Sequence, residues 1–580
     1  MSPAMSRCCL SVLLLLLLLP LLKAAAASSA RPVVQVEQGA LRGVTLRSSS
    51  GRPFFAFRGV PYARPPVGKL RFQEPEPMKS WMGVWDAENY GSPCIQYVFI
   101  ANPKQSRIVG DEDCLHLNVF TPKLPSADNP SSLFDVFVYI HGGGFMSGAG
   151  SYYGPEHLMD RDVVVVTINY RLGILGFLSM EHELLPGNNG LKDQSMALSW
   201  IKKNIERFGG NPESITISGT SAGGASVHFH YLSPYSKGLF QKGMSFSGSS
   251  LVPWAITEGS REKSDKLVSL VGCEAAAHKD ILKCLKSRPA RQLVEMTKHF
   301  QVWRYNPFTP FGPTVEIAGK KPFLSKHPAH LITEGAVQDL PWLTSVTTEE
   351  GLYPAADFVT KHDAMKELDA RFEEVSAYLL DYNYTAPQEI HHEIGKKVRK
   401  YYLGEKRIST STAAEVIQLF GDRIFVVEVE RAARLQASIN KSPVYFYVFG
   451  YRGKYSFSES MAETNVNLGV SHADDTAYIM NVNDKFGLTP LETEEDRKMM
   501  NIMLDMCINF SKTGNPAPVK NLKWPIVKHD SKNIPFIRIS SSESIIPDSS
   551  ADLGNRELWD SLGIQEPQIQ LKMKKPQDEL

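Results

Sequence analysis

The stretch FGGNPESITISGTSAGG, residues 208–224, places a serine between a predicted strand and a predicted helix. Residues 214–218 are rich in β-forming side chains, and helix-forming residues follow the serine. A chain that turns sharply from strand to helix needs small residues beside the turn. The glycines here are Gly219, Gly223 and Gly224. Ser221 is therefore predicted to have a strained backbone conformation and an exposed hydroxyl.

Short β-rich runs alternate with helical stretches, such as residues 193–208, around this turn. The other strand-like runs are residues 134–140, 163–169, 444–451 and 535–539. Strands and helices in alternation imply a mainly parallel sheet with helices on its faces. Residues 255–420 are more helical and less regular. We therefore predict an α/β fold in one domain, residues 31–565, with a large, mostly parallel central sheet and a long helical insertion.

Composition and the amino terminus limit the classes of protein that fit. The chain has 580 residues, 43% of them hydrophobic, and a formal charge of +1. A near-neutral chain disfavours a nucleic-acid partner. Residues 10–22 form an apolar run that follows Arg7 and precedes small residues, which is typical of a secretory signal peptide, here residues 1–30. Because the run is shorter than the roughly 20 residues that span a bilayer, we expect no transmembrane segment.

A secretory signal implies an oxidising compartment, in which cysteines pair. Of the seven cysteines, Cys8 and Cys9 fall in the signal, and the remaining five suggest two disulfides and one free thiol. The favoured pairs join sequence neighbours: Cys94 with Cys114, and Cys273 with Cys284. Cys507 is then left as a buried, unreactive thiol in a helical run.

Three sequons and the carboxyl terminus also bear on location. Asn383, Asn440 and Asn509 each begin an N-x-S/T triplet that could carry a glycan. Residues 566–580 form a polar tail that ends in QDEL, one residue different from the K-D-E-L and H-D-E-L retrieval signals. We expect a secretory-pathway protein, either held in the endoplasmic reticulum lumen by a retrieval receptor or secreted.

A glycine-rich motif, HGGGF at residues 141–145, follows the predicted strand 134–140. Without Cβ atoms the backbone can approach a substrate carbonyl closely, and its N–H groups can bind the oxygen as it becomes negative. We predict that Gly143, Gly144 and Ala222 donate the hydrogen bonds of an oxyanion hole. A phosphate cradle is the alternative, but the G-x-x-x-x-G-K pattern is absent.

A serine nucleophile needs a base to take its proton. The chain has 15 histidines, and position alone does not select one. His472 lies in GVSHADD, residues 469–475, in a predicted loop after the strand 444–451. Catalytic residues are often carried on such loops, so His472 is the candidate base.

Four long motifs resemble the signatures of type-B carboxylesterases, the cholinesterase-like branch of the α/β-hydrolase fold. They are FRGVPYARPPVGKLRF at residues 57–72, EDCL with LNV at 112–119, HGGGF, and residues 208–223. The resemblance extends from about residue 33 to residue 559. It implies an α/β-hydrolase fold, and it is closest in character to insect carboxylesterases.

This resemblance implies a Ser-Glu-His triad in which Ser221 is the nucleophile, Glu350 the acid and His472 the base. The family places the acid directly before a glycine, as Glu350 stands before Gly351. Glu349 is the alternative acid. The resemblance also implies the same two disulfide loops. It further implies two structural ion pairs, Arg71 with Glu112 and Arg171 with Asp193.

Residues around the triad bear on the substrate. Ser247 resembles a serine that lies beside the triad in some relatives, and Trp254 resembles an acyl-pocket aromatic. No tryptophan lies between Cys94 and Cys114, where cholinesterases bind a quaternary ammonium group. Thr220 stands where cholinesterases have Glu and juvenile hormone esterases typically have Gln. These departures disfavour choline esters and juvenile hormone as substrates.

We therefore predict a serine carboxylesterase that hydrolyses uncharged, small-molecule carboxylic esters to acid and alcohol through an acyl-enzyme, with no metal and no cofactor. One alternative is a catalytically silent adhesion or binding protein with this fold, as neuroligins are. Another is a hormone- or lipid-specific esterase. The presence of all three triad residues favours an enzyme over a silent protein.

Overall fold

The computed structural model describes residues 31–565, except 99–106, 126–132, 318, 320, 465, 483–492, 520 and 529. The predicted signal peptide and the polar tail with its QDEL ending lie outside the described residues. None of the helices within the described ranges is long and apolar enough to cross a membrane.

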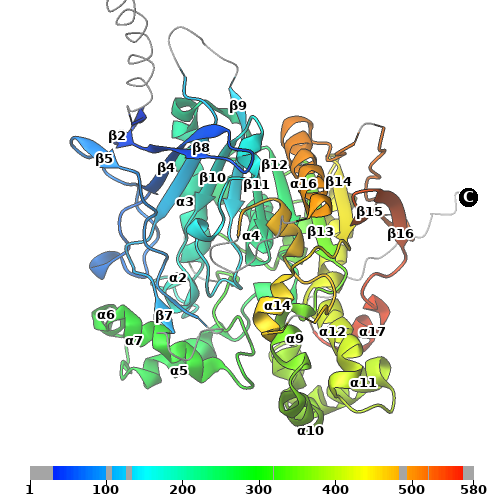
Figure 1. The fold of residues 1–580 in the computed structure, drawn as a ribbon. Helices are drawn as coiled ribbons and strands as arrows, with labels where there is room; N and C mark the ends of the chain where they lie inside the picture. Colours follow the sequence, from blue (N-terminus) through cyan, green and yellow to red (C-terminus); the bar gives the residue numbers. More distant parts are fainter. Residues whose placement is uncertain are drawn as a thin grey trace, which may run out of the picture.

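An 11-stranded sheet runs through the molecule in the order β16-β15-β14-β13-β12-β11-β9-β10-β8-β4-β3 (Figure 1). Pairs from β10 to β15 are parallel, and the pairs at either edge are antiparallel. The strands are β3 (Val44–Arg47), β4 (Pro53–Pro61), β8 (His116–Thr121), β9 (Phe134–Ile140), β10 (Val164–Ile168), β11 (Gly210–Thr220), β12 (Lys242–Phe246), β13 (Trp342–Thr347), β14 (Val444–Phe449), β15 (Ile534–Ser541) and β16 (Ser544–Ser550). The prediction of a large, mostly parallel sheet is confirmed.

Helices cover both faces of this sheet, because the parallel strands carry apolar side chains on both sides. In β9, Val136, Val138 and Ile140 face one core, which also contains apolar residues of α3 (Asn189–Asn204), α4 (Ala222–Leu232) and α13 (Val427–Ile439). Phe137 and Tyr139 face the other core, which contains the apolar side of α16 (Glu494–Thr513). Side chains that alternate along a strand thus fill two separate cores.

The helical insertion is in two parts, one before β13 and one after it, and those of its helices that Figure 1 labels lie below the sheet. The first contains α5 (Ser260–Leu270), α6 (His278–Ser287), α7 (Ala290–Glu295) and α8 (Pro328–Thr333). The second contains α9 (Leu352–Val359), α10 (His362–Leu379), α11 (His391–Leu403) and α12 (Ala413–Gly421). A π-helical turn, Asp422–Val426, joins α12 to α13.

Both predicted disulfides are present. Cys94 bonds to Cys114 and Cys273 to Cys284, while Cys507 is free and buried in α16. The two predicted ion pairs are also present, Arg71 with Glu112 and Arg171 with Asp193, each at 2.6 Å.

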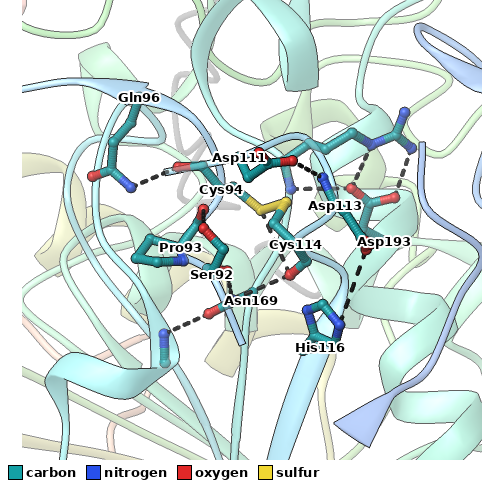
Figure 2. Close-up of a disulfide and its surroundings, with 12 residues drawn as sticks. Ser92, Pro93, Cys94, Gln96, Asp111, Asp113, Cys114, His116, Asn169 and Asp193 are labelled. Atoms are coloured by element: carbon teal, nitrogen blue, oxygen red, sulfur yellow. Dashed lines mark hydrogen bonds and ion pairs between the residues drawn. A yellow bond between two sulfur atoms is a disulfide. The ribbon is translucent and has the colours of Figure 1, made fainter. Parts of the chain in front are cut away.

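The first disulfide, shown in Figure 2 with Gln96 and Asn169 beside it, is joined by hydrogen bonds to the backbone that follows the glycine-rich segment. Gln96 accepts a hydrogen bond from the Gly148 amide at 2.8 Å and donates to the Cys94 carbonyl at 2.8 Å. Asn169 donates to the Cys114 carbonyl at 3.1 Å and accepts from the Gly150 amide at 2.8 Å. The disulfide loop therefore supports the backbone that follows HGGGF.

Candidate active site

Ser221 lies at the turn between β11 and α4, as predicted. Its backbone has φ 60° and ψ −124°, a conformation that is strained for a residue with a side chain. A Cβ atom at Gly219 would lie 2.6 Å from the Gly223 carbonyl carbon, and one at Gly223 would lie 2.0 Å from the Ile140 oxygen. These glycines are therefore required by close backbone contact. As a whole residue, Ser221 is only 8% exposed, so the turn that carries it lies largely below the surface.

Glu350 follows β13 and is 1% exposed. Its Oε2 accepts a hydrogen bond from His472 Nδ1 at 2.6 Å. Its Oε1 accepts from the Ser247 hydroxyl at 2.5 Å and from the Thr347 amide at 2.7 Å. With three donors around it, this buried carboxylate is well satisfied. Glu350, not the alternative Glu349, is the acid beside the imidazole.

The imidazole of His472 has one nitrogen bonded and one nitrogen available. Because Nδ1 donates to Glu350, the lone pair of the neutral ring is on Nε2. Nε2 is buried and has no hydrogen-bond partner among the described residues. The rings of Phe425 and Tyr353 lie 4.3 Å and 5.5 Å from the imidazole, centroid to centroid. Nε2 can therefore accept a proton, as a general base must.

Two sets of contacts join the Ser221 turn to the other two residues. The Ser221 amide donates to the Phe246 carbonyl at 2.8 Å, and the next residue, Ser247, bonds to Glu350. On the other side, the hydroxyls of Thr220 and Thr476 share a hydrogen bond of 2.5 Å, and Thr476 is four residues after His472. The structure thus brings the elements that carry the three predicted triad residues to one edge of the sheet, where neighbouring parallel strands end.

The glycine-rich segment packs against the same turn. A Cβ atom at Gly142 would lie 3.0 Å from the Ser221 Cβ atom. Gly143 and Gly144 have φ values of 111° and 58°, in the region that favours glycine. Neither amide donates a hydrogen bond within the part of the chain that the structure describes. The Ala222 amide is in the first turn of α4, where N–H groups have no partner in the helix.

Trp254 belongs to a cluster of aromatic rings that reaches from the glycine-rich segment to His472. Its ring lies 6.2 Å from Phe145, 5.6 Å from Phe308 and 5.8 Å from Phe425. Its indole N–H donates to the Ile424 carbonyl at 2.9 Å. Sequence reasoning identified Trp254 but missed Phe425. Phe425 is in the π-helical turn of the insertion, where no motif marks it.

Buried carboxyls follow the imidazole directly. Burial raises the pKa of Asp474 to about 7 and that of Asp475 to about 6. Asp475 accepts a hydrogen bond from the Tyr447 hydroxyl at 2.7 Å. Among the described residues, no group of three or more His, Cys, Asp or Glu side chains is arranged to hold a metal ion.

Comparison with known proteins identifies the family and the fold. Residues 30–552 match the sequence model of a family described as "Carboxylesterase family". The chain is 40% identical to venom carboxylesterase-6 of Apis mellifera over 539 residues, 93% of this chain and 95% of that protein. It is 41% identical to esterase FE4 of Myzus persicae, over 89% of this chain and 90% of that protein. The crystal structure of juvenile hormone esterase from Manduca sexta, with OTFP covalently attached, is similar with a TM-score of 0.79 and 29% identity, and the match covers 92% of this chain and 99% of that one.

Proposed function

The chain belongs to the carboxylesterase family, and from that membership we propose that Ser221, Glu350 and His472 are the catalytic triad with which it hydrolyses uncharged carboxylic esters to acid and alcohol. The observation that carries this assignment is the 2.6 Å bond from His472 Nδ1 to Glu350, with Nε2 buried and unpartnered among the described residues.

Acylation begins when the Ser221 oxygen attacks the ester carbonyl carbon while His472 Nε2 takes the hydroxyl proton. Glu350 keeps the ring in the required tautomer and stabilises the imidazolium that forms. The oxygen that becomes negative accepts hydrogen bonds from the amides of Gly143, Gly144 and Ala222. The carbonyl then re-forms, the C–O bond to the alcohol breaks, and the alcohol leaves with the proton from His472.

Deacylation repeats these steps with water. His472 Nε2 takes a proton from the water, whose oxygen attacks the acyl carbon. The same three amides stabilise the second tetrahedral intermediate, and the bond to the Ser221 oxygen breaks as the proton returns to it. The carboxylic acid is released and the free serine is restored.

The aromatic cluster around Trp254 supports an apolar ester as the substrate. Phe425 lies beside the imidazole, and Trp254 and Phe308 extend this buried aromatic cluster, so the surroundings of the base are apolar and favour an uncharged acyl or alcohol group. Thr220 is 2% exposed, and its hydroxyl bonds to Tyr139 and Thr476. Thr220 is therefore not available to recognise a substrate group, so we propose a general carboxylesterase and not a juvenile-hormone-specific one.

Hydrolysis of a short chromogenic ester by the purified protein and by Ser221→Ala tests the proposal. We expect the variant to lose at least about three orders of magnitude in kcat, because only binding and the oxyanion hole would remain. An organophosphate should inactivate the parent by forming a phosphoryl bond to Ser221. Unchanged turnover by Ser221→Ala would refute the triad.

We also propose that residues 1–30 are a removed signal peptide, that residues 31–565 are a single catalytic domain, and that the mature protein is in the secretory pathway. Two disulfides support an oxidising compartment. Whether the QDEL ending engages a retrieval receptor is tested by adding one residue after Leu580. We expect more esterase in the medium than from the parent.

The three sequon asparagines are all partly exposed, but they differ in their place relative to the helices. Asn509 lies within α16, where its amide donates to the Ala517 carbonyl at 2.8 Å. Asn383 follows α10, and Asn440 follows α13 and donates a longer bond to the Gln338 carbonyl, at 3.3 Å. We propose glycans at Asn383 and Asn440 before Asn509, and the mass lost by each Asn→Gln variant would test this order.

A further inference from the structure

The carboxylate of Glu349 joins the loop that carries Glu350 to the loop that carries His472. Glu349 Oε2 accepts a hydrogen bond from the Val470 amide at 2.7 Å, and the Glu349 amide donates to the Val470 carbonyl at 3.1 Å. The Thr348 hydroxyl donates to the same Oε2 at 2.6 Å and so fixes the direction of the carboxylate. The carboxylate of Glu349 thus binds the Val470 amide, and the amide of Glu349 binds the Val470 carbonyl.

The geometry of Gly469 shows that this contact is close. A Cβ atom at Gly469 would lie 2.7 Å from the Glu349 carboxylate, and Gly469 has φ 117°. Only glycine combines this backbone conformation with this close approach. The segment just before the imidazole is therefore shaped to receive the Glu349 side chain.

A second carboxylate holds the next amide along the chain. Asp474 accepts a hydrogen bond from the Ser471 amide at 2.7 Å, and its other oxygen accepts from the Phe457 amide at 2.9 Å. The two amides that precede His472 are thus each bound by a carboxylate. Asp474 belongs to the imidazole's own loop, whereas Glu349 comes from the loop of the triad acid. Glu349 is therefore the one that can set the distance between the two loops.

We propose that Glu349 is a positioning residue for the triad, which sets the imidazole of His472 relative to Glu350 and Ser221 by holding the Val470 amide. The inference rests on the proposed role of His472. Glu349 touches no reacting atom. Its loss would let the 469–471 segment shift, and a displacement of the order of 1 Å at a catalytic group costs up to about 100-fold in rate. This role depends on the hydrogen bond that the Glu349 carboxylate accepts and not on the negative charge of the carboxylate.

Steady-state hydrolysis of p-nitrophenyl acetate by the full chain tests this role in Glu349→Ala and Glu349→Gln. We expect Glu349→Ala to lower kcat by about 10- to 100-fold, with KM within about threefold of the parent. Glu349→Gln should stay within about threefold of the parent in kcat, because its amide oxygen can accept the Val470 bond. If Glu349→Ala does not fold, Glu349→Asp, one methylene shorter, should show the same loss.

Glu495→Ala is the matched control. Glu495 also accepts one backbone amide, that of Ser542 at 2.9 Å, but it joins α16 to the turn between β15 and β16. This control should keep the parental kcat. Parental kcat in Glu349→Ala or Glu349→Asp would overturn the inference, and so would a loss in Glu349→Gln as large as in Glu349→Ala, or an equal loss in Glu495→Ala.

Ser221→Ala, measured in the same series, separates this inference from the proposed function. If Ser221→Ala keeps its turnover, the triad itself is wrong. If Ser221→Ala is inactive while Glu349→Ala turns over like the parent, only the role of Glu349 is wrong.

Discussion

Ser247 lies behind Glu350, the proposed triad acid, and its hydroxyl binds the carboxylate oxygen that the imidazole does not contact. Because the Ser247 hydroxyl and the Thr347 amide occupy Glu350 Oε1, Oε2 is left for His472. We predict that Ser247→Ala lowers kcat by roughly tenfold with little change in KM, since an outer hydrogen-bond partner orients a reactive group without touching substrate. Steady-state kinetics on a short ester would measure both constants.

Ser249→Ala is the control for this prediction. Ser249 is also fully buried two residues further on, but its hydroxyl donates to the Glu428 carbonyl at 3.2 Å and not to the acid. Both variants lose one buried hydroxyl, but only Ser247→Ala should have a lower kcat. Equal kcat in the two variants would contradict a role for Ser247 in orienting Glu350.

At this scale the family motifs marked residues that the structure brings into contact, such as His472 with Glu350 and not with Glu349. The resemblance to the family also marked Ser247 and Trp254. The sequence could not show what Glu349 does, because that contact depends on a loop more than 100 residues away along the chain. Nor could it reveal Phe425 or Tyr353, since any aromatic residue in a helical insertion has the same pattern whether it faces the core or the imidazole.

Among the elements, the π-helical turn Asp422–Val426 carries Phe425 to the imidazole. We predict that Phe425→Ala lowers both stability, by about 3–5 kcal/mol, and kcat, because it leaves a cavity beside His472. Phe420→Ala removes an equally buried ring that packs on Phe358 at 5.7 Å. Urea unfolding should show a similar loss in both variants, whereas ester hydrolysis should fall only in Phe425→Ala. A parallel fall in kcat would point to general destabilisation.

The two disulfide loops should differ in their effect on catalysis. Each closes a loop of modest length, with sequence separations of 20 and 11, so losing either should cost about 3 kcal/mol of stability. Only the Cys94–Cys114 loop is bonded to the backbone after HGGGF, through Gln96 and Asn169. Replacing both of its cysteines by serine should therefore also lower kcat, and the same change at Cys273 and Cys284 should not. Kinetics below the unfolding temperature would compare them.

The sequence predicted the bounds of some helices and strands more accurately than those of others. The run 134–140 was predicted with its exact bounds, because a buried parallel strand is a short, continuous apolar stretch. The helix predicted over 193–208 is instead α3, Asn189–Asn204, followed by a 3-10 turn, Ile205–Phe208. The strand predicted over 214–218 extends to Gly210–Thr220. Capping and hydrogen-bond geometry decide such ends, and neither leaves a strong sequence signal.

Across the whole molecule, buried histidines and buried aspartates change the free energy of unfolding in opposite directions as the pH changes. Burial lowers the pKa of five described histidines, so the folded state resists their protonation and loses stability as pH falls below about 6.5. They are His116, then His141 and His157, to about 4, and His228 and His230, to about 3. Burial raises the pKa of Asp422 and Asp475 to about 6 and of Asp474 to about 7. Their contribution is present at low pH and is lost as pH rises through 6–7.

Replacing Asp475 by asparagine isolates the contribution of one of these carboxyl groups to the free energy of unfolding. Asp475→Asn keeps an acceptor for the Tyr447 hydroxyl but does not titrate. Relative to the parent, its free energy of unfolding should therefore increase by about 1 kcal/mol between pH 5 and pH 7.5, because only the parent must ionise a buried carboxyl over that range. Urea unfolding at both pH values would measure the difference. A constant difference would mean that Asp475 is already ionised at pH 5.

The alternation of strands and helices predicted a mostly parallel α/β sheet, and the resemblance of long motifs to a known family predicted the α/β-hydrolase architecture. The strand order could not be predicted from pattern alone. Pairing β8 between β10 and β4, for example, depends on antiparallel contacts between strands far apart in the chain. Hydrophobic periodicity gives each strand two faces and says nothing about its neighbours.

The order of the strands also dictates when activity can first appear. Ser221 follows β11, but its proposed base, His472, comes after β14, and β15, the last strand of the parallel array, is later still. A nascent chain on a ribosome thus carries its nucleophile long before it carries anything to activate it. The polypeptide therefore has no esterase activity through most of its synthesis, so ester turnover reports only on molecules whose translation is nearly complete.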